Sequence, residues 1–337
     1  MGLTGSTSPA VLAIDAGNSK TDVVVVAADG SVLGKSRGGG FQPPSVGVGA
    51  AVDALAETVV AAAAAAGLAD PSGAGRPFVP HVSACLANAD LPVEERELGE
   101  AVQARGWGRT TEVRNDTFAI LRAGLPGDAE PRGVAVVCGA GINCVGMLPD
   151  GRTARFPAIG RISGDWGGGA GLAEEALWFA ARAEDGRGEP TALARTLPAH
   201  FGLDSMYALI EALHLGRIPY PRRHELTPVL FATSAAGDPI ARSVVRRLAE
   251  EVVALSTVAL SRLGLLDEEV PVLLGGSVLA ARHPELDEQI AKLLAARAPR
   301  AVIGVVTAPP VLGAALLGLD RVEASAEART RLRAYFG

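Results

Sequence analysis

The sequence predicts an α/β fold in which one strand-rich unit occurs twice, each copy forming a mixed sheet with helices beside it. Two observations carry this prediction. A strand, a glycine-rich turn, a second strand, an Asp-Gly turn and a third strand follow one another in residues 11–35, and the same order recurs in residues 133–156. Helix-like sequence follows each copy, at residues 49–66 and 171–183. Hairpins combined with alternating strands and helices are typical of mixed sheets in α/β proteins.

Hydrophobic periodicity and turn residues place the individual elements. In the first copy we expect strands at residues 11–14, 22–28 and 31–35, a helix at 49–66, a strand at 81–86, a helix at 92–105 and a strand at 111–114. In the second copy we expect strands at 133–137, 144–148 and 152–156, helices at 171–183 and 238–263, a strand at 270–274, a helix at 286–298, a strand at 301–306 and a last helix that begins within 309–315. We place the domain boundary near residues 117–132. This gives an N-terminal lobe of residues 1–117 and a C-terminal lobe of residues 118–337, with the last helix as a candidate to pack back on the first lobe.

Composition and charge exclude several classes of protein. Of the 337 residues, 48% are hydrophobic, which is enough for a folded core and rules out a disordered chain. The 41 glycines lack the period of collagen. The net charge is −6 and arginine is spread evenly, so we expect no nucleic-acid partner. No run approaches the roughly 18–20 apolar residues of a membrane span, so we expect no membrane partner. The odd number of cysteines, without metal-site spacing, indicates a reducing, cytoplasmic compartment.

The first glycine-rich turn, Asp15-Ala16-Gly17-Asn18-Ser19-Lys20-Thr21, lies between two strands. It therefore differs from dinucleotide-binding and Walker loops, which open a helix. Its backbone N–H groups, its hydroxyls and the Lys20 ammonium suit the phosphates of a nucleotide, and the Asp15 carboxylate suits Mg²⁺. An ordinary hairpin turn, in which Gly and Asn tolerate positive φ, is the alternative.

The second copy repeats this feature at Gly139-Ala140-Gly141-Ile142-Asn143. Small residues also let strands pack closely, so this turn alone is open to a structural interpretation. Two glycine turns in symmetric positions favour phosphate binding, because duplicated halves could grip phosphates from both sides. A third turn, Gly275-Gly276-Ser277, follows an apolar strand at the end of a sheet where ligands of α/β proteins bind. A helix N-cap at Ser277 explains that turn equally well.

Two further segments carry groups that suit an alcohol or a sugar. Asn115-Asp116 ends a strand, and a carboxylate there could orient an acceptor hydroxyl and take its proton during phosphoryl transfer. A simple Asx turn is the alternative. The segment Gly164-Asp165-Trp166-Gly167-Gly168-Gly169 offers a carboxylate for hydroxyls and an indole for C–H bonds. A helix lead-in with a core Trp is the alternative interpretation of that segment.

Six segments, in their order along the chain, resemble the BadF/BadG/BcrA/BcrD ATPase family and its N-acetylglucosamine kinase-like branch. They are Asp15 to Thr21, Asn115-Asp116, Gly139 to Asn143, Gly164 to Gly167, Gly275 to Ser277 and Pro309 to Ala315. The family belongs to the actin, Hsp70 and hexokinase-like superfamily. The resemblance therefore implies duplicated ribonuclease H-like (actin-like ATPase) domains, with mixed sheets flanking an ATP cleft. It covers nearly the whole chain.

The resemblance also implies a role for each matching residue. The β- and γ-phosphates would be held by Gly17, Asn18, Ser19, Lys20 and Thr21, and the metal by Asp15. The second phosphate turn would be Gly139, Ala140 and Gly141, and the adenosine side would be Gly275, Gly276 and Ser277. The catalytic base would be Asp116. The candidates for sugar contacts are Gln42, Asn115, Asp116, Asn143, Asp165 and Trp166.

The departures from the family pattern concentrate on the sugar side. Gln42 stands where the sugar kinases usually have Asn, and Ile159 stands where they have Trp. Trp166 replaces the Glu of the usual Gly-Asp-Glu-Gly, and Ala140 stands where Thr is common. The phosphate machinery is therefore better supported than the identity of the acceptor.

The first hypothesis is an ATP-dependent kinase that phosphorylates a hydroxyl of an amino sugar such as N-acetylglucosamine or glucosamine, with ATP, Mg²⁺ and a small-molecule sugar as ligands. The second is an ATPase activator of a 2-hydroxyacyl-CoA dehydratase, a class in the family that holds an iron–sulfur cluster at a dimer interface. Cys138 and Cys144 lie in or beside expected strands, which disfavours that hypothesis. The third is a non-catalytic sugar or nucleotide sensor. The sequence leaves open which hydroxyl reacts and whether a homodimer forms.

Overall fold

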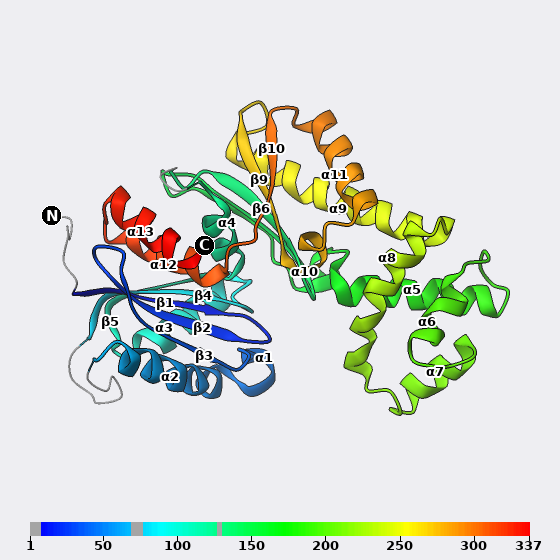
Figure 1. Ribbon diagram of the computed structural model, residues 1–337, viewed down its shortest axis with the longest axis horizontal. Helices are drawn as coiled ribbons and strands as arrows, with labels where there is room; N and C mark the ends of the chain where they lie inside the picture. Colours follow the sequence, from blue (N-terminus) through cyan, green and yellow to red (C-terminus); the bar gives the residue numbers. More distant parts are fainter. Residues whose placement is uncertain (1–7, 69–76, 127–129) are drawn as a thin grey trace. The chain divides into compact units, whose positions relative to one another are not determined.

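The structure of the chain, a computed structural model, describes residues 8–68, 77–126 and 130–337 (Figure 1). It contains two five-stranded sheets, with the orders β3-β2-β1-β4-β5 and β10-β9-β6-β7-β8. The first sheet consists of β1 (Pro9–Ala16), β2 (Thr21–Ala27), β3 (Val32–Gly38), β4 (Val79–Leu86) and β5 (Gly108–Asn115). The second consists of β6 (Gly133–Cys138), β7 (Ile142–Met147), β8 (Thr153–Arg155), β9 (Val270–Gly275) and β10 (Ala301–Val305). Taken from β8 to β10, the second sheet repeats the order of the first, so the predicted duplication is confirmed.

Both sheets are mixed, as the hairpins predict. In the first, β1 and β2 pair antiparallel, as do β2 and β3, whereas β1, β4 and β5 run parallel. In the second, β7 and β8 pair antiparallel and β9 and β10 parallel. The two Asp-Gly turns form where expected, and both Gly30 and Gly151 have positive φ.

The helices are α1 (Pro43–Val46), α2 (Val48–Ala65), α3 (Pro92–Gln103), α4 (Thr117–Gly124), α5 (Gly168–Glu184), α6 (Leu193–His200), α7 (Met206–His214), α8 (Leu226–Ala235), α9 (Pro239–Leu263), α10 (Gly276–Ala280), α11 (Pro284–Arg297), α12 (Pro310–Arg321) and α13 (Ala326–Phe336), with 3-10 turns at Gly160–Ser163 and Tyr220–Glu225. Local chemistry fixes their ends. At the start of α9, the Asp238 carboxylate accepts the Ala241 N–H at 2.8 Å and Pro239 occupies the first turn. At its end, Gly264 takes the left-handed conformation.

Some expected elements differ from the structure. The region expected as a domain boundary contains α4, whose residues are largely buried. Helix α12 is not the last, because α13 follows it. The sequence prediction named none of α6, α7 and α8, which are short and, in α6, interrupted by Pro198. The strand expected at 144–148 begins at Ile142, so Ile142 and Asn143 belong to β7 and not to the preceding turn.

By internal contacts the chain divides into two compact units. The first comprises Met1–Ala135, Val145–Pro157 and Val306–Gly337, and the second comprises Val136–Cys144 and Ala158–Val305. Residues 127–129, within the expected boundary region, lie outside the described residues. The division into lobes of residues 1–117 and 118–337 stays a prediction.

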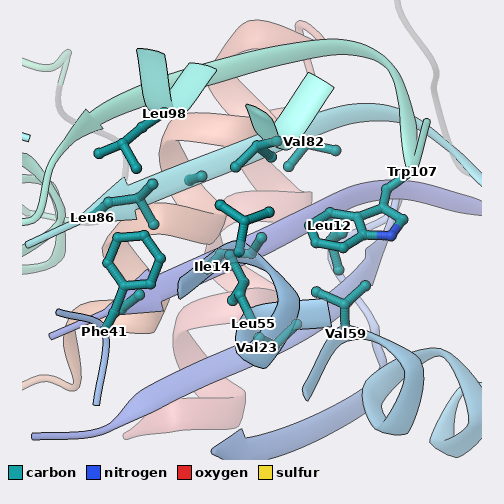
Figure 2. Packing of buried hydrophobic residues seen from close by; sticks show 14 of the residues in the cluster. Leu12, Ile14, Val23, Phe41, Leu55, Val59, Val82, Leu86, Leu98 and Trp107 are labelled. Carbon is teal, nitrogen blue, oxygen red and sulfur yellow. The ribbon is translucent and has the colours of Figure 1, made fainter. Parts of the chain in front are cut away.

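Strand alternation gives the first sheet two apolar faces. On one face Leu12, Ile14 and Val23 pack in a cluster with Leu55 of α2 and Leu98 of α3 (Figure 2). The alternate residues pack with the C-terminal helices. The cluster on that second face includes Val11, Ala13 and Val24 from the strands and Leu312, Ala315 and Leu316 from α12. The sheet is therefore buried between helices on both sides.

Helix α2 corrects one expectation of the sequence. By length and composition alone it is apolar enough to cross a membrane. Among the described residues it is the one helix with this property. Its buried residues, among them Val52, Leu55 and Val59, belong to the core cluster of the first sheet. The helix also carries two charged residues, Asp53 and Glu57. Its apolar composition is therefore explained by packing on the sheet.

His81 is a buried titratable group in the middle of the first sheet. It is 2% exposed, and its Nδ1 lies 2.9 Å from Thr110 Oγ1, whereas its Nε2 is buried with no hydrogen-bond partner among the described residues. Burial lowers the pKa of His81 below the ordinary value of 6.5. The unfolded chain therefore binds a proton more readily than the folded one.

We expect the folded state to lose stability as the pH falls through about 6.5, because protonation of His81 favours unfolding. The variant His81→Gln removes the titrating group. Its melting temperature should fall less steeply than that of the unmodified chain between about pH 8 and about pH 5.5. Parallel curves in thermal unfolding would contradict this assignment.

Candidate active site

Two acidic residues lie at one edge of the first sheet. Parallel pairing brings the carboxyl ends of β1, β4 and β5 to this edge, with Asp15 opposite Cys85 and Leu86 opposite Asn115. Asp116 follows directly as the N-cap of α4. The carboxyl edge of parallel strands is where ligands of open α/β sheets bind. The structure therefore brings together the predicted metal ligand and the predicted base.

The charged forms of these two carboxyls are disfavoured by their surroundings. Asp15 is 6% exposed, and its carboxylate has no hydrogen bond or ion pair among the described residues. Burial raises the pKa of Asp15 to about 8, helped by the charges of Asp116 and Asp22 and opposed by Lys20. Burial also raises the pKa of the half-buried Asp116 to about 6, against the effect of the Thr117 backbone N–H. A cation at Asp15 would stabilise the charged form of its carboxyl.

The first glycine turn is a closed backbone loop with exposed side chains. The Gly17 N–H donates to the Lys20 carbonyl at 2.9 Å, and the exposed residues of the turn are Asn18, Ser19 and Lys20. Lys20 Nζ lies 3.4 Å from Asp22, but Arg37 makes two hydrogen bonds to the same carboxylate, at 2.6 and 3.0 Å. Because Arg37 already pairs with Asp22, the Lys20 ammonium can interact with an anion.

Gln42 and its neighbours are hydrogen-bonded to the backbone of this turn. Its Nε2 donates to the Asn18 carbonyl at 3.0 Å, and the Phe41 N–H donates to the Gly17 carbonyl at 2.9 Å. Gly40 passes so close that a Cβ on it would lie 2.1 Å from the Asn18 carbonyl oxygen. The predicted sugar contact Gln42 is thus hydrogen-bonded to the first glycine turn.

The sequence prediction missed Asn88, which joins the same two loops. Its Nδ2 donates to Asn18 Oδ1 at 3.0 Å and to the Phe41 carbonyl at 3.1 Å, and its φ is +62°. It follows β4, a largely buried strand of the first sheet. That pattern, Leu86 followed by a small residue and Asn88, was the signal available in the sequence.

Asn115 is buried and engaged at both ends of its amide. Its Nδ2 donates to Asp90 Oδ1 at 2.8 Å, and its Oδ1 accepts the Thr117 N–H at 2.9 Å. These bonds fix the first turn of α4 and hence the backbone of Asp116. Asp90 is a second residue that the sequence prediction missed, and it too follows β4.

In the second unit, the Gly139–Gly141 turn lies against the start of α5. The Gly169 N–H donates to the Gly139 carbonyl at 2.7 Å, and the Ala170 N–H donates to the Ala140 carbonyl at 3.1 Å. Gly168 has a φ of +71°, and a Cβ on it would lie 2.5 Å from Gly141 Cα. The turn and the glycine loop expected on the acceptor side are therefore one backbone assembly.

A pocket of about 220 Å³ opens beside this assembly. We call it the acceptor pocket, after the role proposed for it below. Its lining includes Ala140, Gly141, Asp165, Trp166, Ala170 and Glu174. Asp165 Oδ2 accepts the Gly160 N–H at 2.9 Å and the Ser163 hydroxyl at 2.5 Å, whereas Oδ1 accepts no hydrogen bond from the described residues. Trp166 is 7% exposed, and its indole N–H has no partner among the described residues. The Arg247 guanidinium lies 4.3 Å from the Trp166 ring centroid. The pocket thus presents the carboxylates of Asp165 and Glu174 beside the Trp166 ring.

Two other predicted residues of this unit have clear positions. Asn143 lies in β7, where its Oδ1 accepts the Cys144 N–H at 2.7 Å. Gly276 has a φ of +81°, and a Cβ on it would lie 2.4 Å from the Cys138 carbonyl oxygen. The N-cap of α10 is Gly275, so Ser277 lies exposed within the helix and does not cap it. The third glycine turn is therefore required by the close passage of the chain over β6.

The three cysteines are free and buried. Burial raises the pKa of the Cys138 thiol to about 12, and it also raises the pKa of the Cys85 and Cys144 thiols. Protonated, buried thiols are poor metal ligands. Within the described ranges, no three His, Cys, Asp or Glu side chains cluster in a way that could hold a metal ion.

The fold and the strand-end carboxylates define an ATPase-type α/β protein, and a family model matches residues 12–318. The chain belongs to the BadF/BadG/BcrA/BcrD ATPase family. An N-acetyl-D-glucosamine kinase from Dictyostelium discoideum is 26% identical over 317 residues, which cover 92% of this chain and 97% of the relative. An N-acetylmuramic acid/N-acetylglucosamine kinase from Clostridium acetobutylicum is 25% identical over 193 residues, 57% of this chain and 62% of that protein.

Solved structures share the fold. A protein from Chromobacterium violaceum, described as a candidate N-acetylglucosamine kinase, superposes with a TM-score of 0.66 at 24% identity and covers 93% of this chain and 100% of its own. A ROK family glucokinase from Streptomyces griseus, in complex with glucose and AMPPNP, has a TM-score of 0.56 at 17% identity and covers 91% and 98%. The predicted actin-like fold class is confirmed.

The variant Gly168→Ala tests the backbone assembly at the start of α5. The added methyl group would collide with the Gly139–Gly141 turn, and the positive φ of residue 168 is a conformation that L residues rarely adopt. We therefore expect a loss of about 1–3 kcal/mol in the free energy of unfolding. Gly171→Ala, in the same helix, is the matched control, because a Cβ there meets nothing within 4 Å. It should be neutral or stabilise by about 0.5–1 kcal/mol. Equal effects in urea unfolding would contradict the proposed contact.

Proposed function

We propose that this chain is an ATP-dependent sugar kinase, which transfers the γ-phosphoryl group of ATP to a hydroxyl of N-acetylglucosamine or a glucosamine-like amino sugar. The family and the full-length relative named as a kinase for N-acetyl-D-glucosamine support the class. The observation that carries the proposal is the carboxyl of Asp116. It is half-buried, its pKa is raised to about 6, and it lies at the edge of the sheet that also holds Asp15.

Asp116 has the properties of a general base. Deprotonated at neutral pH, it would orient the sugar hydroxyl and accept its proton as the new oxygen–phosphorus bond forms. The bond between the γ-phosphorus and the bridging oxygen breaks in the same step, and ADP leaves with the bonding electron pair. The Asn115 amide holds the start of α4, so the backbone that carries the Asp116 carboxyl is held before the substrate arrives.

The two glycine turns are proposed to hold the nucleotide phosphates. In the first, the backbone N–H groups of residues 17–21 would supply donors and the Lys20 ammonium positive charge, and Asn18, Ser19 and Lys20 are exposed. In the second, Gly139, Ala140 and Gly141 carry no large side chain that would block an approaching phosphate. Gly275, Gly276 and Ser277 are proposed to lie near the adenosine. These roles come from the family resemblance and from the exposure of the turns.

Mg²⁺ fits the surroundings of Asp15. The carboxylate is buried, has no partner among the described residues, and feels the negative charges of Asp116 and Asp22. With one carboxylate in place, the other ligands would be water and phosphate oxygens, an arrangement usual for Mg²⁺ with nucleotides. When bound, the ion supplies positive charge that neutralises the phosphate oxygens.

The acceptor side is proposed to use Asp165, Trp166 and Asn143 of the second unit. One carboxylate oxygen of Asp165 accepts hydrogen bonds from Gly160 and Ser163, and the other would accept a hydrogen bond from a sugar hydroxyl. Gln42 and Asn115 act in support of the phosphate turn and of α4. The buried cysteines disfavour the hypothesis of an ATPase activator with a shared iron–sulfur cluster, and they agree with a cytoplasmic site of action.

Replacing Asp116 by Asn should lower kcat by about 10²–10⁴-fold, because the amide cannot accept the proton of the sugar hydroxyl. The matched control is Asp53→Asn, an exposed carboxylate on α2 that pairs with Arg105. It should keep full activity. Coupled measurement of ADP release gives both values, and full sugar-dependent turnover by Asp116→Asn would refute the role of this residue.

A panel of sugars tests the reaction class. ADP release should rise strongly when N-acetylglucosamine or glucosamine is added, since the acceptor hydroxyl completes the site. ATP turnover that is indifferent to every sugar would instead support the ATPase hypothesis. Tight sugar binding without turnover would support a sensor.

A further inference from the structure

Helix α5 carries two adjoining hollows on one of its faces. Ala170, Gly171 and Glu174 line the acceptor pocket, and Glu174, Leu177, Trp178 and Ala181 line a second hollow. These positions are three or four residues apart, so they form one stripe along the helix. From Ala170 to Ala181 the stripe extends about 16 Å along the helix axis. Glu174 lines both hollows, so they adjoin at its side chain.

The second hollow, which we call the aromatic groove, has a volume of about 630 Å³. Its lining includes Glu174, Leu177, Trp178, Ile210, His214 and Tyr220. Trp178 and Tyr220 are each 53% exposed, so both rings are accessible to a ligand in the groove. The groove lies within the second unit, on α5, α7 and the 3-10 turn at Tyr220–Glu225.

Each of the two exposed rings is backed by an arginine. The Arg182 guanidinium lies 4.7 Å from the Trp178 ring centroid, and the Arg223 guanidinium lies 3.9 Å from that of Tyr220. Arg223 is itself held near Glu174, with Nε 3.4 Å from Oε1. Stacking of this kind fixes the plane of a ring before a ligand binds.

The chemistry of the groove suits a saccharide. Fixed aromatic faces contact the C–H bonds of a pyranose ring, and the Glu174 carboxylate and the His214 imidazole offer hydrogen bonds to its hydroxyls. The Glu174 side chain also lines the acceptor pocket, so a ligand that spans both hollows would pass a carboxylate where they adjoin.

We propose that the acceptor is an amino sugar linked to a second saccharide unit, with the reacting sugar in the acceptor pocket and the second unit on Trp178 and Tyr220 in the aromatic groove. The inference rests on the proposed kinase function and specifies its substrate class. It assigns a specificity role to two aromatic residues that take no part in phosphoryl transfer.

The test compares N-acetylglucosamine with its β-1,4-linked dimer, N,N′-diacetylchitobiose, as acceptors for the full chain. The unmodified protein should have a higher kcat/KM for the dimer. Trp178→Ala and Tyr220→Ala should each lower kcat/KM for the dimer by about tenfold through KM, as expected for loss of one stacked ring, and leave the monomer unchanged. Tyr207→Ala is the matched control, because Tyr207 is a more exposed aromatic residue, at 73%, on α7 outside the groove lining.

The outcomes separate this inference from the kinase proposal. Phosphorylation of the monomer, with neither turnover nor binding of the dimer, would overturn the inference and leave the kinase proposal intact. An equal loss of both activities in Trp178→Ala, with an unchanged melting temperature, would also overturn it. The inference would also be overturned if sedimentation showed that two copies of this chain associate and that Trp178→Ala separates them, because a second copy would then cover the groove. Failure of both sugars to stimulate ADP release would refute the kinase proposal itself.

Discussion

Backbone that lies directly on backbone is the constraint on which the rest of the structure depends. Gly168 contacts the Gly139–Gly141 turn, Gly40 contacts the Asn18 carbonyl, and Gly313 of α12 passes over the Ala119 carbonyl of α4. At each place a single added carbon would collide with main-chain atoms, which cannot rotate away as a side chain can. The segments that carry the chemistry are therefore held by the main chain itself, and their exposed surfaces remain open to ligands.

This rigid framework explains how unfavourable charges are tolerated. The first sheet is covered on both faces, so the carboxyl ends of its parallel strands are largely withdrawn from water. Asp15 loses solvation there without gaining a protein partner, and Asp116 loses part of its own. Buried polar groups without partners are costly in a stable fold and are frequent at functional sites. The stability supplied by the core permits that cost.

The sequence was most informative where a local rule determines the outcome. Asp29-Gly30 and Asp150-Gly151 predicted their hairpins because a tight turn needs positive φ, and the symmetric glycine turns predicted the duplication. The hydrogen-bond partners of Gln42 and Asn115 were not predictable, because each amide bonds to a loop far away in sequence or to a turn that only the fold defines. Asn88 was missed because it matters through two loops that the fold brings together. The aromatic groove was missed for a similar reason, since α7 and the turn at Tyr220 were absent from the predicted elements.

The return of α12 and α13 to the first sheet has a consequence for the order in which the chain becomes a folded body on the ribosome. Strands β1 to β5 are synthesised well before α12, yet the face that contains Val11, Ala13 and Val24 packs with Leu312 and Leu316 of that helix. Until α12 emerges, this apolar face lacks that cover, so the core of the first sheet cannot be completed while the second unit is still being synthesised.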